Sequence, residues 1–269
     1  MKKDFWNGKV VLITGASSGI GHSIFLELSK LPCTLILVAR RAEEIPNPTG
    51  LHPESRVIRI NCDLSQESEI SKLKEKVQKS VNQIDILFNN AGITAHGRFD
   101  SLSMEVYHRT FAINFFGPVF LIQSLLPLLL KAKGNVVTTS TVSALYGVPG
   151  RAAYSSSKSA LHAALEALRI EMMEEGIGIS LVCVPYTDTA LRQSGLASDG
   201  SKLEESPAKG KRLKSEEVAK RLLSIAEDKE ARLVTINSSG RFLNWLRLFL
   251  PKFLEKTMYK KLKHDFQKH

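Results

Sequence analysis

A tyrosine and a lysine four residues apart, Tyr154 and Lys158, are the side chains of this sequence best suited to proton transfer. They fall at the start of a segment with helical periodicity, where residues at i and i+4 share one face. An ammonium group beside a phenol favours the phenolate and lowers the pKa of the tyrosine, as acid/base chemistry near neutral pH requires. On spacing alone, two exposed side chains on a solvated helix face fit equally well.

A second candidate site is the glycine-rich stretch 14–21, T-G-A-S-S-G-I-G, between a predicted strand and a predicted helix. Gly15 permits a tight turn, Gly19 allows a pyrophosphate to approach the backbone, and Gly21 allows the helix to pack against the sheet. Free N–H groups and the helix dipole attract phosphate at this end of a helix. The stretch therefore predicts a nucleotide-binding loop and not a plain turn.

Two arginines, Arg40 and Arg41, end the second predicted strand. Dinucleotide folds that prefer NAD usually carry an acidic residue there, which binds the ribose hydroxyls. Guanidinium groups suit the 2′-phosphate of NADP(H) instead, through charge-assisted hydrogen bonds. The alternative is that both arginines are simply solvated at a strand end. The sequence favours NADP(H) as the cofactor.

The elements that position these residues alternate between strand and helix. Buried runs without polar alternation predict a parallel sheet, and the alternation predicts a doubly wound α/β fold. Residues 104–130 are expected to form one or two helices broken near Ala112. The expected strands are 9–14, 33–39, 56–61, 84–89, 135–140, 177–184 and 232–237, and the expected helices are 19–31, 66–81, 104–130, 153–175 and 215–225.

One domain accounts for most of the chain. Residues 1–240 are predicted to form it, with a substrate loop at 187–214 that lacks apolar periodicity. Residues 241–269 are predicted to follow as a basic amphipathic extension. The sequence contains no internal repeat. The first two motifs both lie within the predicted domain.

Three motifs together resemble the short-chain dehydrogenase/reductase family. They are the glycine-rich stretch (TGxxxGxG), residues 89–92 (NNAG) and residues 154–158 (YxxxK), and their order and spacing match over roughly residues 8–190. The resemblance implies a single Rossmann-like domain with a parallel sheet of about seven strands. It also implies an oxidoreductase that transfers a hydride between a nicotinamide cofactor and a carbonyl or secondary alcohol.

The resemblance also implies the catalytic roles. Tyr154 would be the general acid in ketone reduction or the base in alcohol oxidation, and Lys158 would also hold the nicotinamide ribose. Asn114 matches the asparagine that holds a water in the proton relay. The family usually has a serine thirteen residues before the tyrosine, where this chain has Thr141. Neighbours on a strand point to opposite faces, so either Thr141 or Ser140 reaches the substrate, and Thr141 is preferred.

Cofactor contacts are carried over in the same way. Asp63 and Leu64 resemble the pair beside the adenine, and residues 90–92 resemble the stretch lining the adenosine ribose. Tyr186 stands in place of the glycine that often follows the proline after the sixth strand, which departs from the family pattern, and Thr187 or Thr189 is still expected to supply the hydroxyl for the nicotinamide amide. The full expected set is Gly15, Ser17, Ser18, Gly19, Ile20, Gly21, Arg40, Arg41, Asp63, Leu64, Asn90, Ala91, Gly92, Tyr154, Lys158, Pro185, Thr187 and Thr189.

Composition bounds the remaining possibilities. With 269 residues, 43% hydrophobic and 24% charged, the chain is neither disordered nor collagen-like. Three scattered cysteines, Cys33, Cys62 and Cys183, are expected to be buried reduced thiols, which indicates a reducing compartment. The histidines show no metal-ligand spacing. The longest apolar run, 119–130, is shorter than the ~20 residues of a membrane span, so a cytoplasmic protein is expected, peripheral to a membrane at most.

The last segment is basic and apolar at once. Residues 241–269 carry six of the ten net positive charges, while Leu, Phe, Trp and Met recur there at helical spacing. Such apolar density argues against nucleic acid, which requires charge more than Leu and Phe. Two interpretations stay open, a membrane-surface helix and a helix packed on protein near the substrate cleft. Both favour a lipophilic substrate.

Small residues on the helix after Tyr154 would permit close helix–helix approach, and the resemblance implies a homodimer or homotetramer. We therefore expect an NADP(H)-dependent carbonyl reductase or alcohol dehydrogenase. The alternative is a non-catalytic NADP(H)-binding sensor or scaffold. The presence of Asn114, Tyr154 and Lys158 argues against that alternative, because a binding protein needs no acid beside the nicotinamide.

Overall fold

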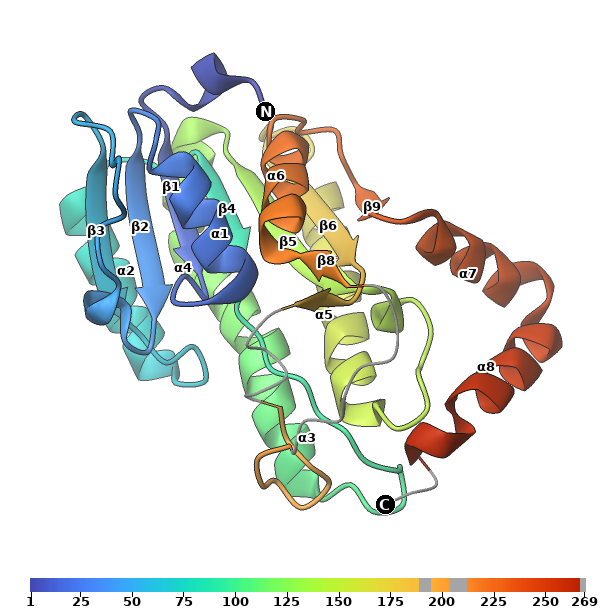
Figure 1. Cartoon of the computed structure of the whole chain (residues 1–269). Coiled ribbons are helices and arrows are strands. Elements are labelled where there is room, and N and C mark those ends of the chain that lie inside the picture. The colour runs from blue at the N-terminus through green and yellow to red at the C-terminus, as the bar shows by residue number, and fades with distance from the viewer. Residues whose placement is uncertain (189–194, 204–211, 267–269) are drawn as a thin grey trace.

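A seven-stranded parallel sheet forms the centre of the molecule in the computed structural model, which describes residues 1–188, 195–203 and 212–266 (Figure 1). The strand order is β3-β2-β1-β4-β5-β6-β9, and every neighbouring pair is parallel. The predicted doubly wound α/β fold is confirmed. The strands are β1 (Val10–Thr14), β2 (Thr34–Ala39), β3 (Arg56–Asn61), β4 (Ile86–Asn89), β5 (Asn135–Thr141), β6 (Gly178–Val184) and β9 (Leu233–Thr235).

Helices cover both faces of the sheet (Figure 1). On one face, α1 (Gly19–Leu28) packs beside α6 (Ser215–Ala226). On the other face lie α2 (Glu67–Ser80), α4 (Gly117–Ala132) and α5 (Ala152–Glu171). The two layers bury separate apolar clusters against the strands, with Ile24, Phe25 and Leu222 in the first and Leu73, Leu125 and Leu161 in the second. α1 and α5 end earlier than their apolar periodicity predicts, at Leu28 and Glu171.

The long helical run before β5 contains a π-helical turn. Between α3 (Met104–Phe111) and α4 lies η3 (Ala112–Phe116), at the place where a break was predicted. The start of α4 touches the loop after β3 so closely that a Cβ on Gly117 would lie 2.2 Å from the carbonyl oxygen of Leu64. Only glycine permits this approach.

By length and composition alone, the run Met104–Ala132 could cross a membrane, and 44% of its most apolar window is buried inside the protein. It contributes Leu121, Leu125 and Leu129, which are fully buried, to the cluster beneath the sheet. We therefore interpret it as a core helix of the domain.

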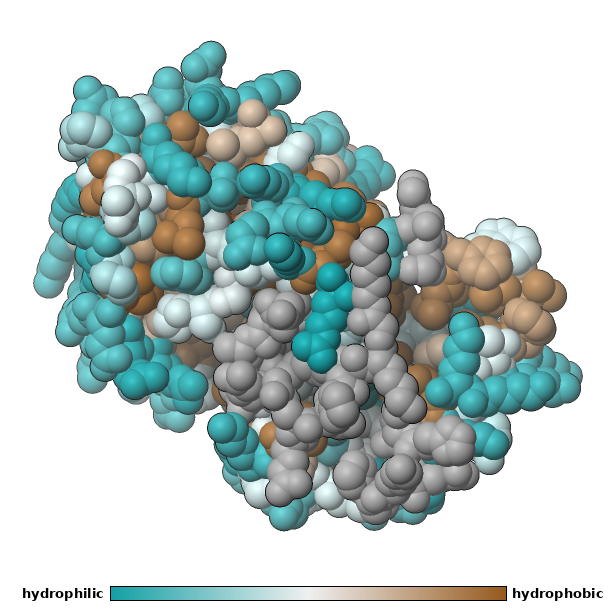
Figure 2. Space-filling model, in the orientation of Figure 1, coloured by the Kyte–Doolittle hydropathy of each residue, from teal (hydrophilic) through white to brown (hydrophobic). Residues whose placement is uncertain are grey.

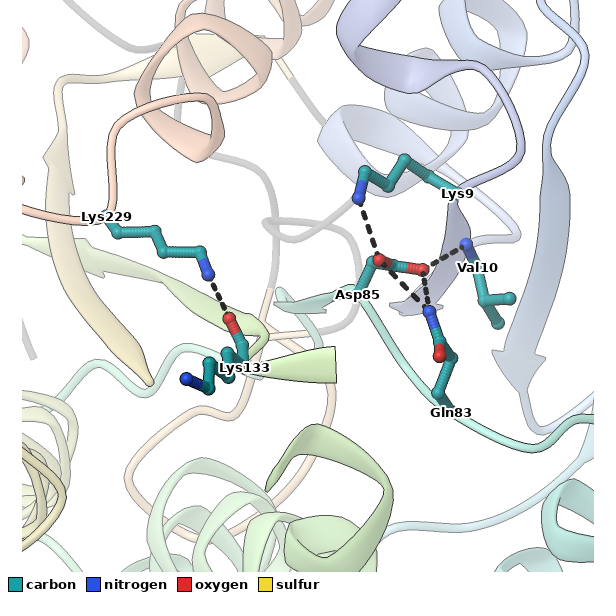
Figure 3. Close-up of polar contacts among 6 residues, drawn as sticks. All are labelled: Lys9, Val10, Gln83, Asp85, Lys133 and Lys229. Carbon is teal, nitrogen blue, oxygen red and sulfur yellow. Dashed lines mark hydrogen bonds and ion pairs between the residues drawn. The ribbon is translucent and has the colours of Figure 1, made fainter. Parts of the chain in front are cut away.

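A buried carboxylate connects the amino-terminal ends of two central strands of the sheet (Figure 3). Asp85, just before β4, accepts hydrogen bonds from Lys9 Nζ at 2.9 Å, from the Val10 N–H at 2.9 Å and from Gln83 Nε2 at 3.4 Å. Lys229 donates to the carbonyl of Lys133 in the same region. The contacts of Asp85 join β1 to β4 at the end of the strands opposite to the one where the predicted motifs lie, and the Lys229 contact joins the segment after α6 to the turn before β5.

All three cysteines are free and buried, as predicted. Burial raises the pKa of the Cys33, Cys62 and Cys183 thiols to about 12. Such thiols are protonated at neutral pH and are therefore poor nucleophiles.

The chain leaves the sheet after β9 as two helices, α7 (Ser238–Phe249) and α8 (Pro251–Phe266), which form an arm along one side of the domain (Figure 1). The predicted helical extension is thus confirmed. The predicted boundary between residues 240 and 241 falls inside α7, and the division into domains stays a prediction. Within the predicted substrate loop, β7 (Thr187–Asp188) pairs with β8 (Leu213–Lys214), and residues 189–194 and 204–211 lie outside the described residues.

Candidate active site

The carboxyl end of β5 meets the first turns of α5 through three consecutive residues. The Thr139 carbonyl accepts a hydrogen bond from Lys158 Nζ at 3.2 Å. The Ser140 hydroxyl lies 2.6 Å from His162 Nε2, and the Thr141 side chain lies beside Tyr154.

The alternation of the strand thus sends Ser140 toward the core and Thr141 toward the tyrosine, and the hydroxyl of Ser140 is already engaged. Thr141 also lies 3.1 Å from the Ser143 hydroxyl. Of the two candidates for the substrate hydroxyl donor, only Thr141 contacts Tyr154 in this structure.

Tyr154 and Lys158 are both buried, with 9% and 5% of their surfaces exposed. Burial raises the pKa of Tyr154, and Arg151 and the Thr141 side chain oppose that rise. Burial lowers the pKa of Lys158 to about 8. The expectation that the ammonium group lowers the tyrosine pKa is therefore not met: burial dominates, while Lys158 donates to the Thr139 carbonyl.

Asn114 is fully buried in the π-helical turn. Its side chain pairs with the backbone of Ile93 in both directions, donating to the carbonyl and accepting from the N–H at 2.9 Å each, and its Nδ2 lies 3.1 Å from Ser157 Oγ. A Cβ on Gly92 would lie 3.0 Å from Asn114 Oδ1 and 3.6 Å from Lys158 Nζ. The structure therefore brings Asn114 and Lys158 together at Gly92.

The glycine-rich loop has the conformation that the sequence predicts. Gly15 and Gly19 have positive φ angles of 67° and 56°. A Cβ on Gly21 would lie only 2.4 Å from the Gly15 carbonyl oxygen. Ser18 caps α1 without a side-chain hydrogen bond, so its side chain leaves the first N–H groups of the helix free for an anion. Ser17 and Ser18 are exposed, and Ile20 is buried beneath the loop.

Asn90 and Ala91 tie this loop to the neighbouring strands. Thr14 Oγ1 accepts hydrogen bonds from the N–H groups of Asn90 and Ala91, at 2.9 and 3.0 Å. The Asn90 side chain donates to the Thr14 carbonyl at 3.2 Å and accepts from Thr139 Oγ1 at 3.1 Å. These hydrogen bonds therefore connect the carboxyl ends of β1, β4 and β5 at the place where the cofactor is expected.

The residues expected around the adenosine occupy the carboxyl ends of β2 and β3. Arg40 and Arg41 are exposed, and Arg41 lies 3.5 Å from Glu44 in the short 3-10 turn η2 (Ala42–Glu44). The Asp63 carboxylate accepts from the N–H and hydroxyl of Ser65, at 2.9 and 2.8 Å. Leu64 is buried.

The segment after β6 departs from the family pattern, as the sequence shows. The Thr187 hydroxyl donates to the Pro185 carbonyl at 2.9 Å. Tyr186 is 59% exposed, and its ring centroid lies 5.6 Å from the guanidinium carbon of Arg151, a cation–π distance. Thr189, the other expected hydroxyl, lies outside the described residues.

Sequence reasoning did not single out Thr14, Thr139, Ser157 or His162, which support the site residues. The signal for Ser157 and His162 was their place on α5, beside Tyr154 and one turn beyond Lys158. Thr14 and Thr139 end or nearly end buried strands, where a hydroxyl without a partner would be costly.

The residues present fit a dinucleotide. The loop keeps positive φ angles and leaves no room for a Cβ at Gly21, the helix behind it starts without a side-chain cap, and a buried lysine stands at the far end of the site. The loop would hold the pyrophosphate, and Lys158 would hold the nicotinamide ribose.

Comparison with known proteins identifies the family. The sequence pattern described as "short chain dehydrogenase" matches residues 9–199. The chain belongs to the short-chain dehydrogenase/reductase family. It is therefore an oxidoreductase that acts on alcohols or carbonyl compounds with a nicotinamide cofactor.

Similar proteins agree with this assignment. Dehydrogenase/reductase SDR family protein 7-like of Drosophila melanogaster is 33% identical over 91% of this chain and 77% of its own length. 11-beta-hydroxysteroid dehydrogenase A of Sesamum indicum is 30% identical over 92% of this chain and 74% of its own length. The solved structure of an alcohol dehydrogenase from Thermococcus sibiricus, complexed with 5-hydroxy-NADP, superposes with a TM-score of 0.71 at 25% identity, covering 86% of this chain and 95% of that one.

Proposed function

We propose that the protein is an NADP(H)-dependent reductase of lipophilic ketones, or the corresponding dehydrogenase of secondary alcohols. The observation that carries the proposal is the buried contact between Tyr154 and Thr141, with Lys158 one turn further along α5. The nicotinamide supplies or accepts the hydride when it is bound.

The side chains of this chain then handle the proton. Tyr154 holds the proton that moves to the carbonyl oxygen, and Thr141 binds the same oxygen as a second donor. The pKa of Tyr154 lies above its ordinary value, so the phenol carries its proton at neutral pH, as a general acid must. Asn114, held by Ile93 and Ser157, would position the water through which the tyrosine regains its proton.

The preference for NADP(H) rests on charge. Arg40 and Arg41 are exposed at the end of β2, where a 2′-phosphate would lie, and Arg40 forms no ion pair within the described part of the chain. The bound 5-hydroxy-NADP of the Thermococcus sibiricus enzyme supports the same choice.

The preference for a lipophilic substrate rests on a small apolar cluster. Ala153, directly before the tyrosine, packs with Ala95, Leu102, Val106 and Leu196. This cluster joins the segment after β4 to the described part of the predicted substrate loop. The relative named as an 11-beta-hydroxysteroid dehydrogenase supports an apolar ketone or alcohol.

The proposal extends to assembly and location. Ala163 and Ala167 are exposed on α5, and small residues permit close packing of a second α5, so we infer a homodimer or homotetramer. Three free cysteines in the described structure support a reducing, cytoplasmic setting.

The test is oxidation of NADPH, followed by fluorescence, with short-chain ketones, long-chain ketones and sterol ketones, alongside NADH. We expect turnover with NADPH that rises with the apolar size of the ketone, and loss of turnover in Tyr154→Phe. Tyr259→Phe, on the exposed side of α8, is the matched control and should keep full turnover. The double variant Arg40→Ala, Arg41→Ala should raise the KM for NADPH and leave that for NADH unchanged.

A sensor or scaffold remains the competing function. It would show NADPH binding by fluorescence without turnover of any ketone or alcohol, and Tyr154→Phe would then bind and behave like the wild type. Absence of NADPH binding would refute both functions.

A further inference from the structure

The two C-terminal helices present an apolar surface that the domain does not cover. Six large side chains of α7, the start of α8 and the residue between them are 47% to 68% exposed: Phe242, Trp245, Leu248, Phe249, Leu250 and Phe253. We call these residues the aromatic face. Phe242 stacks on Trp245 at 6.1 Å between ring centroids, and Trp245 lies 5.3 Å from Phe249. Figure 2 shows hydrophobic residues gathered where α7 lies in Figure 1.

A different side of the same helices already packs on the domain. Leu246 and Leu254 are 7% and 2% exposed, and Arg247 donates to the Leu145 carbonyl. At the start of α7, a Cβ on Gly240 would lie 2.8 Å from a methyl of Val142. The aromatic face is therefore not needed to hold the two helices on the domain. One side of the helices packs on protein, and the other side, the aromatic face, is available to a membrane.

The surroundings of the aromatic face are basic. Lys252, Lys256, Lys260 and Lys261 are exposed on α8, and none of them forms an ion pair in the described structure. Exposed aromatic residues beside unpaired lysines match the interface of an anionic phospholipid bilayer, where rings sit at the headgroup level and cations meet phosphates. A protein partner would instead have to supply several carboxylates around an apolar pocket.

The lengths of the helices indicate how they would lie. α7 has 12 residues and α8 has 16, and Pro251 begins the second helix. Each is shorter than the ~20 residues that a span requires, so they suit a position in the plane of the interface.

We propose that α7 and α8 dock the protein on an anionic phospholipid membrane, with the aromatic face inserted among the headgroups. The arm rests on η4 (Val142–Ala144) and Leu145, directly after Thr141. Docking would therefore place the entrance to the catalytic site beside the lipid from which an apolar ketone partitions. Only this last consequence rests on the proposed function; the docking itself does not.

Sedimentation of the full-length protein with vesicles tests the proposal, with phosphatidylcholine alone and with added phosphatidylserine. We expect binding that requires phosphatidylserine and weakens with salt. Trp245→Glu with Phe249→Glu should weaken it by more than roughly tenfold, because two rings no longer insert. Lys252→Glu with Lys256→Glu and Lys260→Glu should weaken it by at least roughly 100-fold, because three attractive charges become repulsive.

Matched controls separate these effects from general changes in apolarity or charge. Ile170 and Met173, at and just after the end of α5, are 69% and 67% exposed, and their replacement by Glu should leave vesicle binding unchanged, with light scattering checking that the oligomeric state is also unchanged. The charge control is Lys72→Glu with Lys76→Glu and Lys79→Glu on α2.

Equal binding by all variants, or no binding by the wild type, would overturn the proposal. A wild-type dimer in light scattering that Trp245→Glu with Phe249→Glu converts to monomers, without vesicle binding, would assign the aromatic face to a second copy of the chain. Vesicle binding without ketone turnover would leave docking intact and refute the proposed function alone.

Discussion

The hydrogen bond between Ser140 and His162 lends itself to a double-mutant cycle. Both residues are buried, and 2.6 Å separates Ser140 Oγ from His162 Nε2. Burial, and then the charge of Lys158, lowers the pKa of His162 to about 4, so the imidazole is neutral at pH 7. Ser140→Ala would leave Nε2 without a partner inside the core, and His162→Leu would leave the hydroxyl of Ser140 without one.

Each single change should therefore cost about 1–3 kcal/mol, the penalty of an unsatisfied buried polar group. For a chain of this size, that corresponds to a fall in Tm of roughly 2–12 °C. The double variant replaces both polar groups by apolar ones. Its loss in free energy of unfolding should therefore be smaller than the sum of the two single losses by about 1–2 kcal/mol.

Urea unfolding followed by circular dichroism measures all three free energies. A double variant whose loss equals the sum of the single losses would refute the coupling, as would a Ser140→Ala variant as stable as the wild type. Turnover reports on the site separately: Thr139 and Thr141, on either side of Ser140, contact Lys158 and Tyr154. Single variants that keep full turnover would show that the hydrogen bond does not align these contacts.

Three further predictions concern the cofactor loop, the amino edge of the sheet and pH. Gly21→Ala places a methyl 2.4 Å from the backbone oxygen of Gly15, so NADPH affinity measured by fluorescence should fall at least about tenfold. The control Gly147→Ala, where the added methyl meets open space, should leave NADPH affinity unchanged. Asp85→Ala should cost about 2 kcal/mol and lower Tm by roughly 4–8 °C without changing NADPH affinity; an unchanged Tm would contradict the role of the carboxylate. The unfolded chain binds a proton on His162 near pH 6.5 and the folded protein only near pH 4, so stability should fall as pH drops through this window, by about 3 kcal/mol from this group. His162→Gln should remove that part of the pH dependence, and identical slopes in both proteins would refute it.

The sequence predicted those features that depend on local pattern. Buried runs such as that of β2 and the amphipathic spacing of Ile70, Leu73 and Val77 predicted strand and helix, and the structure confirms both. The tight turn at Gly15 followed from its place between a strand and a helix. These features could be predicted because the residues that define them lie close together in the chain.

Features that depend on contacts between distant segments could not be predicted. Whether Ser140 or Thr141 points toward the core depends on His162, which contacts Ser140 from α5. The direction of the pKa shift of Tyr154 depends on burial by several segments, and spacing from Lys158 carries no information about burial. The tail presented the same limit, since its helical spacing did not reveal which side would pack through Leu246 and Leu254.

The π-helical turn at Ala112–Phe116 makes the length of the helix part of the site. Its hydrogen bonds span i to i+5, so it holds one more residue than a regular α-helical path between the same two ends. Deletion of a single residue here would allow an uninterrupted α-helix between the same two ends, which is the better local structure, but would change the angular position of residues within the turn by up to about 100°. Asn114 would persist in the sequence and be turned away from Ile93 and Ser157. The irregular turn therefore sets the direction of the Asn114 side chain, and the chain should accept substitutions there more readily than deletions.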